Sequence, residues 1–202
     1  MRQTSGTPMK KPKITAFVLG VLLLSGCGGK TSDNEDTWEI VIVDGMATVP
    51  AGTYAEGTEL EASVLGFELD VTEVTVEAYQ ACVDDGACEP GRAASEEPDC
   101  NMGAAGRQEH PINCVNGSQA VAYCAWVGKR LPTEDEWKFA AWYSDGRSYP
   151  WGDENPEDQL CWSGGSEGKR QSTCPVGSFP EDMSVFGVLD MAGNVEEHVT
   201  GT

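Results

Sequence analysis

The amino-acid sequence predicts an irregular α+β domain that is loop-rich and stapled by disulfides. Two helices with clear start and stop signals lie between residues 118 and 142, whereas the strand-like runs before residue 72 are short. Seven of the eight cysteines follow Cys27, and most of them lie in long stretches without helical or strand periodicity. Such a sequence is typical of exported domains in which disulfides compensate for scarce regular structure.

Residues 1–26 have the parts of a bacterial export signal. Lys10, Lys11 and Lys13 precede an apolar stretch, residues 14–24, that is shorter than the roughly 20 residues that span a bilayer. The following LSGC, which ends at Cys27, resembles the lipobox of bacterial lipoproteins, which is cut before a cysteine that then carries lipid. We therefore predict an envelope protein held to the membrane by lipid on Cys27, facing the periplasm or the exterior. An ordinary secreted protein and an uncut membrane anchor are the alternatives.

The net charge of the chain excludes some classes of binding partner. The formal net charge is −20, with 33 acidic against 13 basic side chains. This argues against nucleic acid, whose phosphates need a positive surface, and against an electrostatic hold on anionic lipid. Most of these acids are interpreted as a solvated surface that keeps the protein soluble, and no protein partner follows from them.

Residues 27–45 are predicted to be the lipidated cysteine and a flexible tether, because residues 28–39 are polar and acidic, and residues 46–202 are predicted to be the domain. Two strand-like runs meet at Asp44-Gly45, which is a hairpin signal. Farther along, Phe67, Leu69 and Val71 alternate with polar residues as in a half-buried strand. Residues 186–191 form a short apolar run that is also predicted to be a strand.

Helix signals are strongest in the middle of the chain. Residues 72–83 predict a helix with Thr72 or Thr75 near its start. Ser118 is a good N-cap for a second helix over residues 119–127, with Gly128 at its end, and the apolar sequence AVAYCAWV predicts that this helix is buried on all sides.

A third helix should begin after Thr133, which forms a capping box with Glu136. Behind it, Trp137, Ala140 and Ala141 form one inward stripe. The tryptophans at 126, 137 and 142 are likewise interpreted as core residues by their spacing, not as a ligand cage.

The cysteines predict three bridges and one orphan thiol. None of their spacings is the CxxC pairing of a zinc site. Cys161 and Cys174 lie in one loop-rich segment and form the first predicted pair. The remaining four, Cys82, Cys88, Cys100 and Cys114, allow three connectivities. His110 beside Cys114 has the residue types of a base and a nucleophile, but an oxidising compartment favours Cys114 in a disulfide and a structural role.

Six short sequence motifs occur in a fixed order: VPAGTY from Val49, ELDVTEVTVEAY from Glu68, AYCAWVGKRLPTEDEWKFAA from Ala122, YPWGD from Tyr149, CPVGSFP from Cys174 and FGVLDMAGNVEE from Phe186. They closely resemble the formylglycine-generating enzyme (sulfatase-modifying factor) domain family over about residues 46–199. The resemblance implies an irregular α+β fold related to C-type lectins. In the family, the cysteine at the position of Cys124 bonds to one near the end of the domain, so Cys124 is expected to be the orphan.

The resemblance also implies a calcium loop. Asn194, the carbonyl of Val195 and the carboxylate of Glu197 match the family's GNVWEW loop, and oxygen ligands of this kind suit calcium. Glu196 and His198 replace tryptophans of the family. A solvated turn with two acids is the alternative. The family's second calcium site has an asparagine where this chain has Leu160, so it is not carried over.

The family's oxidase chemistry, as the resemblance implies it, uses two cysteines late in the domain that bind copper(I) while oxygen converts a substrate cysteine to formylglycine. The sequence ends at Thr202, ahead of the matching segment, so the domain is expected to be incomplete at its C-terminus and copper is not expected. We therefore predict no catalytic residues and a lipid-anchored, non-catalytic binding or scaffold module. The alternative is a formylglycine-generating oxidase, acting on a sulfatase cysteine, whose chain is cut short by truncation or a gene-model error.

Overall fold

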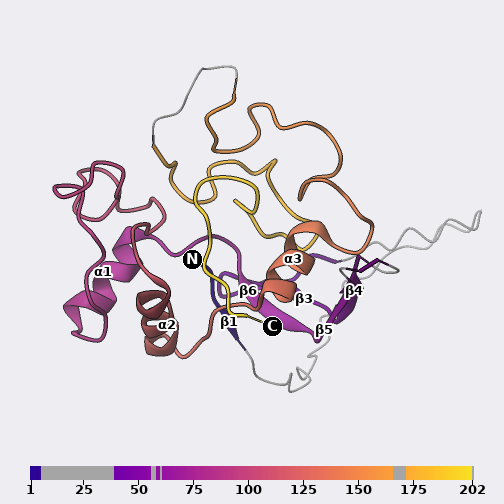
Figure 1. The fold of residues 1–202 in the computed structure, drawn as a ribbon, viewed down its shortest axis with the longest axis horizontal. Helices are drawn as coiled ribbons and strands as arrows, with labels where there is room; N and C mark the ends of the chain where they lie inside the picture. The colour runs from indigo at the N-terminus through magenta and orange to yellow at the C-terminus, as the bar shows by residue number, and fades with distance from the viewer. Residues whose placement is uncertain (6–38, 56–57, 60, 166–171, 202) are drawn as a thin grey trace, which may run out of the picture.

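The computed structural model describes residues 1–5, 39–55, 58–59, 61–165 and 172–201. Helices α1 and α2 lie together at one end of the molecule, and a small sheet occupies its middle (Figure 1). Helix α3 covers the opposite side of the sheet region, and long loops after α3 arch over it (Figure 1). The fold is thus a mixed α and β, loop-rich domain, as the sequence predicts.

The central sheet is antiparallel and has the order β1-β6-β3-β2. Strands β2, Ile42–Val43, and β3, Met46–Val49, form the predicted hairpin. Its turn residues Asp44 and Gly45 have φ of 51° and 75°, the two positive values that a type I′ turn requires. Because β2 belongs to the sheet, the folded part begins ahead of residue 46, the predicted start of the domain.

Strand β6, Phe67–Asp70, lies beside β3 and buries alternate side chains. Phe67 and Leu69 point into the core, which confirms the predicted alternation. A second, two-stranded sheet joins β4, Gly52–Tyr54, to β5, Ala62–Val64. Helix α3 packs on this pair.

Residues 1–5 are built into the central sheet. Strand β1, Thr4–Ser5, pairs with β6, with Thr4 opposite Leu69. The other edge of Thr4 exchanges backbone hydrogen bonds of 2.7 and 3.0 Å with Arg130. The predicted export signal therefore contributes its first residues to the fold. Its basic residues, its apolar stretch and Cys27 lie outside the described residues, as does most of the predicted tether.

Helix α1, Val76–Asp84, begins after Thr75, whose hydroxyl accepts a hydrogen bond from the Ala78 N–H. Thr75, and not Thr72, is thus its N-cap. Helix α2, Gly117–Trp126, begins earlier than predicted, because Asn116 and Gln119 form a reciprocal capping box and leave Ser118 inside the first turn.

Helix α2 is not buried on all sides, which corrects the prediction from its apolar sequence. Ala120, Tyr123 and Cys124 are buried, whereas Val121 and Trp126 are exposed. The helix lies at the edge of the molecule and packs on one side only, against α1 (Figure 1). Trp126 is therefore not a core residue.

Helix α3, Glu134–Trp142, has the predicted capping box: Thr133 accepts from the Glu136 N–H at 3.2 Å, and Glu136 accepts from the Thr133 N–H at 2.8 Å. Phe139, Ala140 and Ala141 form its buried side. Trp137 and Trp142 are only partly buried at the rim of the same core. The predicted stripe therefore holds for the alanines, while Phe139 takes the central place expected of Trp137.

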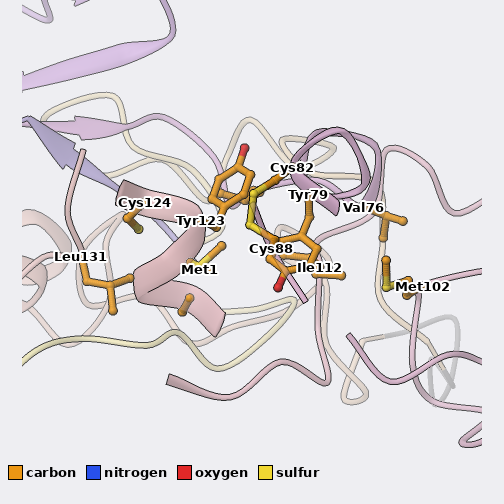
Figure 2. Packing of buried hydrophobic residues seen from close by; sticks show 12 residues of the cluster. Met1, Val76, Tyr79, Cys82, Cys88, Met102, Ile112, Tyr123, Cys124 and Leu131 are labelled. Carbon is orange, nitrogen blue, oxygen red and sulfur yellow. A yellow bond between two sulfur atoms is a disulfide. The ribbon is translucent and has the colours of Figure 1, made fainter. Parts of the chain in front are cut away.

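Two apolar clusters form the core. One surrounds α3 and the central sheet and includes Phe186, Val188 and Met191. Residues 186–191 are thus mostly buried, but they form an irregular segment of turn and bends and not the predicted strand. The other cluster joins α1 and α2 around the Cys82–Cys88 disulfide and includes Met1, which is drawn beside Tyr123 (Figure 2).

Candidate functional site

A cleft of about 720 Å³ lies between α3 and the segment 191–199. Its walls are mixed: Trp137, Trp162, Met191 and Val199 supply apolar surface. Charged side chains that line it are Glu134, Lys138, Glu196 and Glu197. Glu134 and Lys138 form an ion pair of 2.5 Å one helical turn apart. The cleft therefore combines an aromatic surface with an acidic rim.

The floor of the cleft is held by close backbone packing. A Cβ placed on Gly193 would lie 2.8 Å from the carbonyl oxygen of Cys161, so only glycine fits there. The next residue, Asn194, has φ of 63°, a left-handed conformation that asparagine tolerates. Its N–H donates to the Cys161 carbonyl at 2.9 Å.

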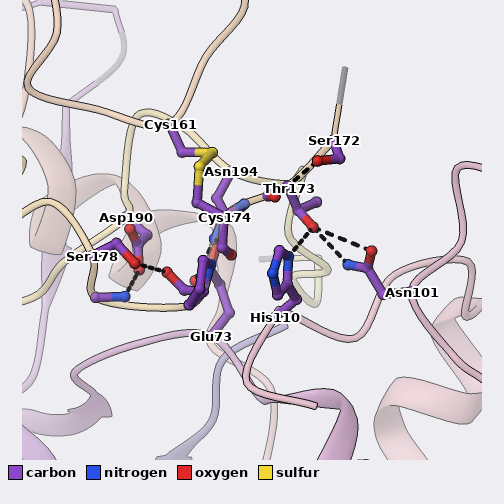
Figure 3. Close-up of a disulfide and its surroundings, with 12 residues drawn as sticks. Glu73, Asn101, His110, Cys161, Ser172, Thr173, Cys174, Ser178, Asp190 and Asn194 are labelled. Atoms are coloured by element: carbon purple, nitrogen blue, oxygen red, sulfur yellow. Dashed lines mark hydrogen bonds between the residues drawn. A yellow bond between two sulfur atoms is a disulfide. The ribbon is translucent and has the colours of Figure 1, made fainter. Parts of the chain in front are cut away.

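The Cys161–Cys174 disulfide, the first pair predicted from the sequence, lies beside Asn194 (Figure 3), and Cys161 lines the cleft. The side-chain oxygen of Asn194 accepts from the Cys174 N–H at 3.0 Å, and its amide nitrogen donates to the Cys174 carbonyl at 3.3 Å. One side chain thus satisfies both backbone groups of Cys174 and ties segment 191–199 to the disulfide.

The predicted calcium ligands have other partners in this arrangement. The Asn194 side-chain oxygen is occupied by the Cys174 N–H, and Glu197 forms a 2.8 Å ion pair with the buried guanidinium of Arg2. Val195, whose backbone carbonyl is the third predicted ligand, lines the cleft. The carboxylate of Glu197 is thus paired with a cation already, and these contacts neither require nor exclude a calcium ion. Calcium remains a prediction from the resemblance.

Beneath the cleft lies a cluster of buried acids that the sequence analysis missed: Glu73, Asp182, Asp190 and Glu197. Burial, with the charge of Asp190, raises the pKa of Asp182 to about 7. Burial raises the pKa of Glu73 to about 9, although the charge of Arg2 opposes this shift. A third member of the cluster, Asp190, accepts a hydrogen bond from the Gly177 N–H at 2.6 Å. A sequence signal existed for Glu73, since it interrupts the apolar run VTEVTV.

His110 and Cys114 do not form a nucleophile and base. Cys114 is bonded to Cys100, which settles the second of the open pairings. The ring Nδ1 of His110 lies 2.8 Å from the Thr173 hydroxyl, which in turn contacts the buried Asn101 (Figure 3). Burial and the charge of Arg107 lower the pKa of His110. The role of this histidine is structural.

Among the described cysteines, six form three disulfides and Cys124 is the free one, buried in the cluster of α1 and α2. Three disulfides indicate an extracellular or envelope protein. No helix among the described residues is long and apolar enough to cross a membrane.

The loop-rich fold, its three disulfides and the packing of Gly193 and Asn194 on Cys161 can be compared with known families of proteins. The sulfatase-modifying factor enzyme 1-like domain family matches residues 31–202, and the chain belongs to this family. A solved structure, that of CarF, shares the fold with a TM-score of 0.56 and 20% identity, over 77% of this chain and 79% of that one.

Three relatives show the range of the family. The formylglycine-generating enzyme of Mycobacterium tuberculosis is 42% identical over 48% of this chain and 35% of its own length. The inactive C-alpha-formylglycine-generating enzyme 2 of Bos taurus is 41% identical over 44% of this chain and 32% of its own. The hercynine oxygenase of Mycolicibacterium thermoresistibile is 34% identical over 71% and 38%, respectively. The chain thus spans about a third of the length of these relatives.

Proposed function

We propose that this protein is a lipid-anchored, non-catalytic member of the sulfatase-modifying factor family that binds a partner in the cell envelope. The observation that carries the proposal is the state of the cysteines. The family's oxidase chemistry needs a pair of thiols, whereas six of the described cysteines form disulfides and Cys124 is 1% exposed. Similarity to an inactive relative supports a non-catalytic role within the same family.

The Cys124 thiol is unsuited to redox chemistry for two reasons. Burial raises its pKa to about 11, so it holds its proton, and a thiolate is the form that binds metal or attacks a substrate. It also lies in the cluster formed by α1 and α2, and it does not line the cleft beside α3. The cleft therefore offers an aromatic and acidic binding surface and not a thiolate.

The catalytic test is an oxidation assay. The purified chain, loaded with copper(I) under oxygen, is incubated with a sulfatase-type cysteine peptide, and the product is analysed by mass spectrometry. We expect the peptide to keep its cysteine. Formation of formylglycine would overturn the proposal and favour the second candidate, an oxidase, which the 42% identity to a formylglycine-generating enzyme supports.

Anchoring is tested separately at Cys27. In a bacterial host given an alkyne-labelled fatty acid, the wild-type chain should become labelled and partition with membranes. A Cys27→Ala variant should lose both properties, because it lacks the thiol that would carry the lipid. Equal labelling of the two chains would refute lipid attachment at this residue.

A further inference from the structure

A second pocket, of about 710 Å³, lies among the loops that follow α3 and arch over the sheet region (Figure 1). It shares no lining residue with the cleft beside α3, and no residue of segments 1–5 or 191–201 lines it. No basic side chain lines it among the described residues. One indole, two amides and four carboxylates do: Trp151, Asn155, Gln159, Asp153, Glu154, Glu157 and Glu181.

The indole of Trp151 is held in place by a tight turn. Tyr149 and Gly152 exchange backbone hydrogen bonds of 2.9 and 3.0 Å, and Pro150 occupies the turn position that suits its fixed φ. The rings of Tyr149 and Trp151 stack with a centroid distance of 5.0 Å and an interplanar angle of 2°. The Trp151 ring N–H also donates to the Glu154 carbonyl at 3.0 Å. Because Tyr149 covers one face of the half-buried indole, the opposite face is the one open to a ligand.

The backbone that carries the carboxylates is held by neighbouring side chains. The Trp162 ring N–H donates to the Glu157 carbonyl at 2.5 Å, and the Gln159 side-chain oxygen accepts from the Glu157 N–H at 2.6 Å. The Gln159 amide nitrogen donates to the Asn155 carbonyl at 3.3 Å. Indoles and an amide therefore fix this loop, and none of these bonds uses the Glu157 carboxylate.

Three of the carboxylates, those of Glu154, Glu157 and Glu181, have no hydrogen-bond or ion-pair partner among the described residues. The fourth, Asp153, accepts from the Ser148 N–H at 2.9 Å. Like charges gathered on one concave surface repel one another, and a cation relieves that repulsion. The open face of an indole attracts a cation independently, through the ring quadrupole. The aromatic ring and the acids thus favour the same ligand chemistry.

We propose that this pocket binds an arginine side chain on a basic segment of a partner protein, with the guanidinium stacked on Trp151 and paired with Glu154 and Glu157. Arginine suits the pocket better than lysine, because its planar group both stacks on aromatic rings and bonds carboxylates in pairs. The surplus of acids over one cation favours a segment with several basic residues. The pocket is independent of the cleft and of the anchoring proposed above, so a negative result at one leaves the other standing.

The test is a titration of the full chain with a capped GRRRG peptide in 0.15 M sodium chloride, where diffuse attraction is screened beyond about 8 Å. Incorporated 5-fluorotryptophan gives each of the six tryptophans a fluorine NMR signal, and the signal of Trp151 is the one lost in Trp151→Phe. This signal should shift with added GRRRG until it saturates. A GKKKG peptide should bind roughly threefold more weakly, and GEEEG should leave the signal in place.

Two triple variants remove the same charge at different places. The pocket variant replaces three lining glutamates: Glu154→Gln, Glu157→Gln and Glu181→Gln. The control variant replaces three exposed glutamates that do not line the pocket: Glu59→Gln, Glu89→Gln and Glu96→Gln. The pocket variant should bind GRRRG about tenfold more weakly, because each exposed ion pair contributes roughly a factor of two. The control variant should stay within about twofold of the wild-type chain, because its charges are screened from the pocket.

A third variant, Trp151→Leu, removes the aromatic face and keeps the carboxylates. It should weaken GRRRG binding about threefold, as loss of a cation–π contact at an exposed site. Unfolding midpoints show whether each variant is folded, and either the glutamine variant or the leucine variant is sufficient for the test.

Equal weakening by the two triple variants would overturn the proposal, because it would show only the overall negative charge of the protein. A Trp151 signal that GRRRG does not move would also overturn it. Displacement of the peptide by about 1 mM calcium, but not by sodium at equal ionic strength, would assign the carboxylates to a metal ion instead.

The chain has basic residues of its own close by in the sequence, Lys169 and Arg170, which lie outside the described residues. A chain with Lys169→Ala and Arg170→Ala should bind GRRRG as the wild-type chain does. Binding that appears only in this double variant would assign the pocket to the chain's own basic residues and overturn the assignment to a partner.

Discussion

Gly193 provides a sharp test of how the cleft is held. An added Cβ would lie 2.8 Å from the carbonyl oxygen of Cys161 and 3.3 Å from its nitrogen. Both atoms belong to the backbone of a disulfide-bonded residue, so they cannot move aside as a flexible side chain would. Segment 191–199 must shift instead, and overpacking of this kind costs about 2 kcal/mol, within a usual range of about 1–3 kcal/mol.

Gly117 is the matched control. It occupies the first residue of α2, and an added Cβ there would meet no atom within 4 Å. Gly117→Ala should stabilise the protein by about 0.4–1 kcal/mol, because alanine reduces the freedom of the unfolded chain. The two alanine variants should therefore differ by about 3 kcal/mol, or roughly a hundredfold in the unfolding equilibrium constant.

Denaturant unfolding, followed by tryptophan fluorescence with the disulfides intact, measures this difference as a change in midpoint at constant slope. Trp137 and Trp162 line the cleft, so a shift of segment 191–199 should also change the native emission of Gly193→Ala but not that of Gly117→Ala. Equal midpoints for the two variants would refute the close packing of Gly193 on Cys161.

Three further outcomes follow from the same structure. The Cys124 thiol, with a pKa raised by burial to about 11, should resist iodoacetamide at pH 8 in the folded chain and react on unfolding; rapid labelling of the native protein would contradict its burial. Because folding raises the pKa of Glu73 from 4.5 to about 9, the unfolded chain releases this proton first, so the free energy of unfolding should fall as pH rises between these values. Glu73→Gln should flatten that slope, measured by urea titration from pH 5 to 9, and an unchanged slope would exclude Glu73 as its source. Asn116→Ala should cost about 1 kcal/mol as loss of an N-cap, and Ser118→Ala clearly less; the reverse order in thermal unfolding would return the cap to Ser118.

Local features were predictable because short-range chemistry fixes them. The Asp44-Gly45 turn and the Thr133 capping box depend on residues within four positions of each other, and both occur as predicted. The start of α2 shows the limit of such reasoning. Both Asn116 and Ser118 are good caps. The side-chain oxygen of Gln119 accepts from the Asn116 N–H, and this second bond of the capping box favours Asn116. The amide nitrogen of Gln119 also donates to the Pro90 carbonyl at 2.9 Å, which holds the side chain in place.

The candidate site was predictable only in part. The sequence singled out Asn194, Glu197 and the Cys161–Cys174 pair, and the structure does bring them together at one cleft. It could not supply their partners. Asn194 bonds to the backbone of Cys174, twenty residues away, and Glu197 pairs with Arg2 at a separation of 195 residues. No local pattern carries such information.

The sequence by itself determined the loop-rich α+β class, the family, the hairpin turn and the cap of the third helix. Each of these depends on neighbouring residues or on short motifs that occur in a fixed order. Tertiary structure alone decided that residues 186–191 form a mostly buried, irregular segment, since burial of an apolar run does not require strand pairing. It also decided that Arg2 lies enclosed among four carboxyl groups. The physical reason is that a charge becomes buried only where distant segments together provide its counter-ions and hydrogen-bond acceptors.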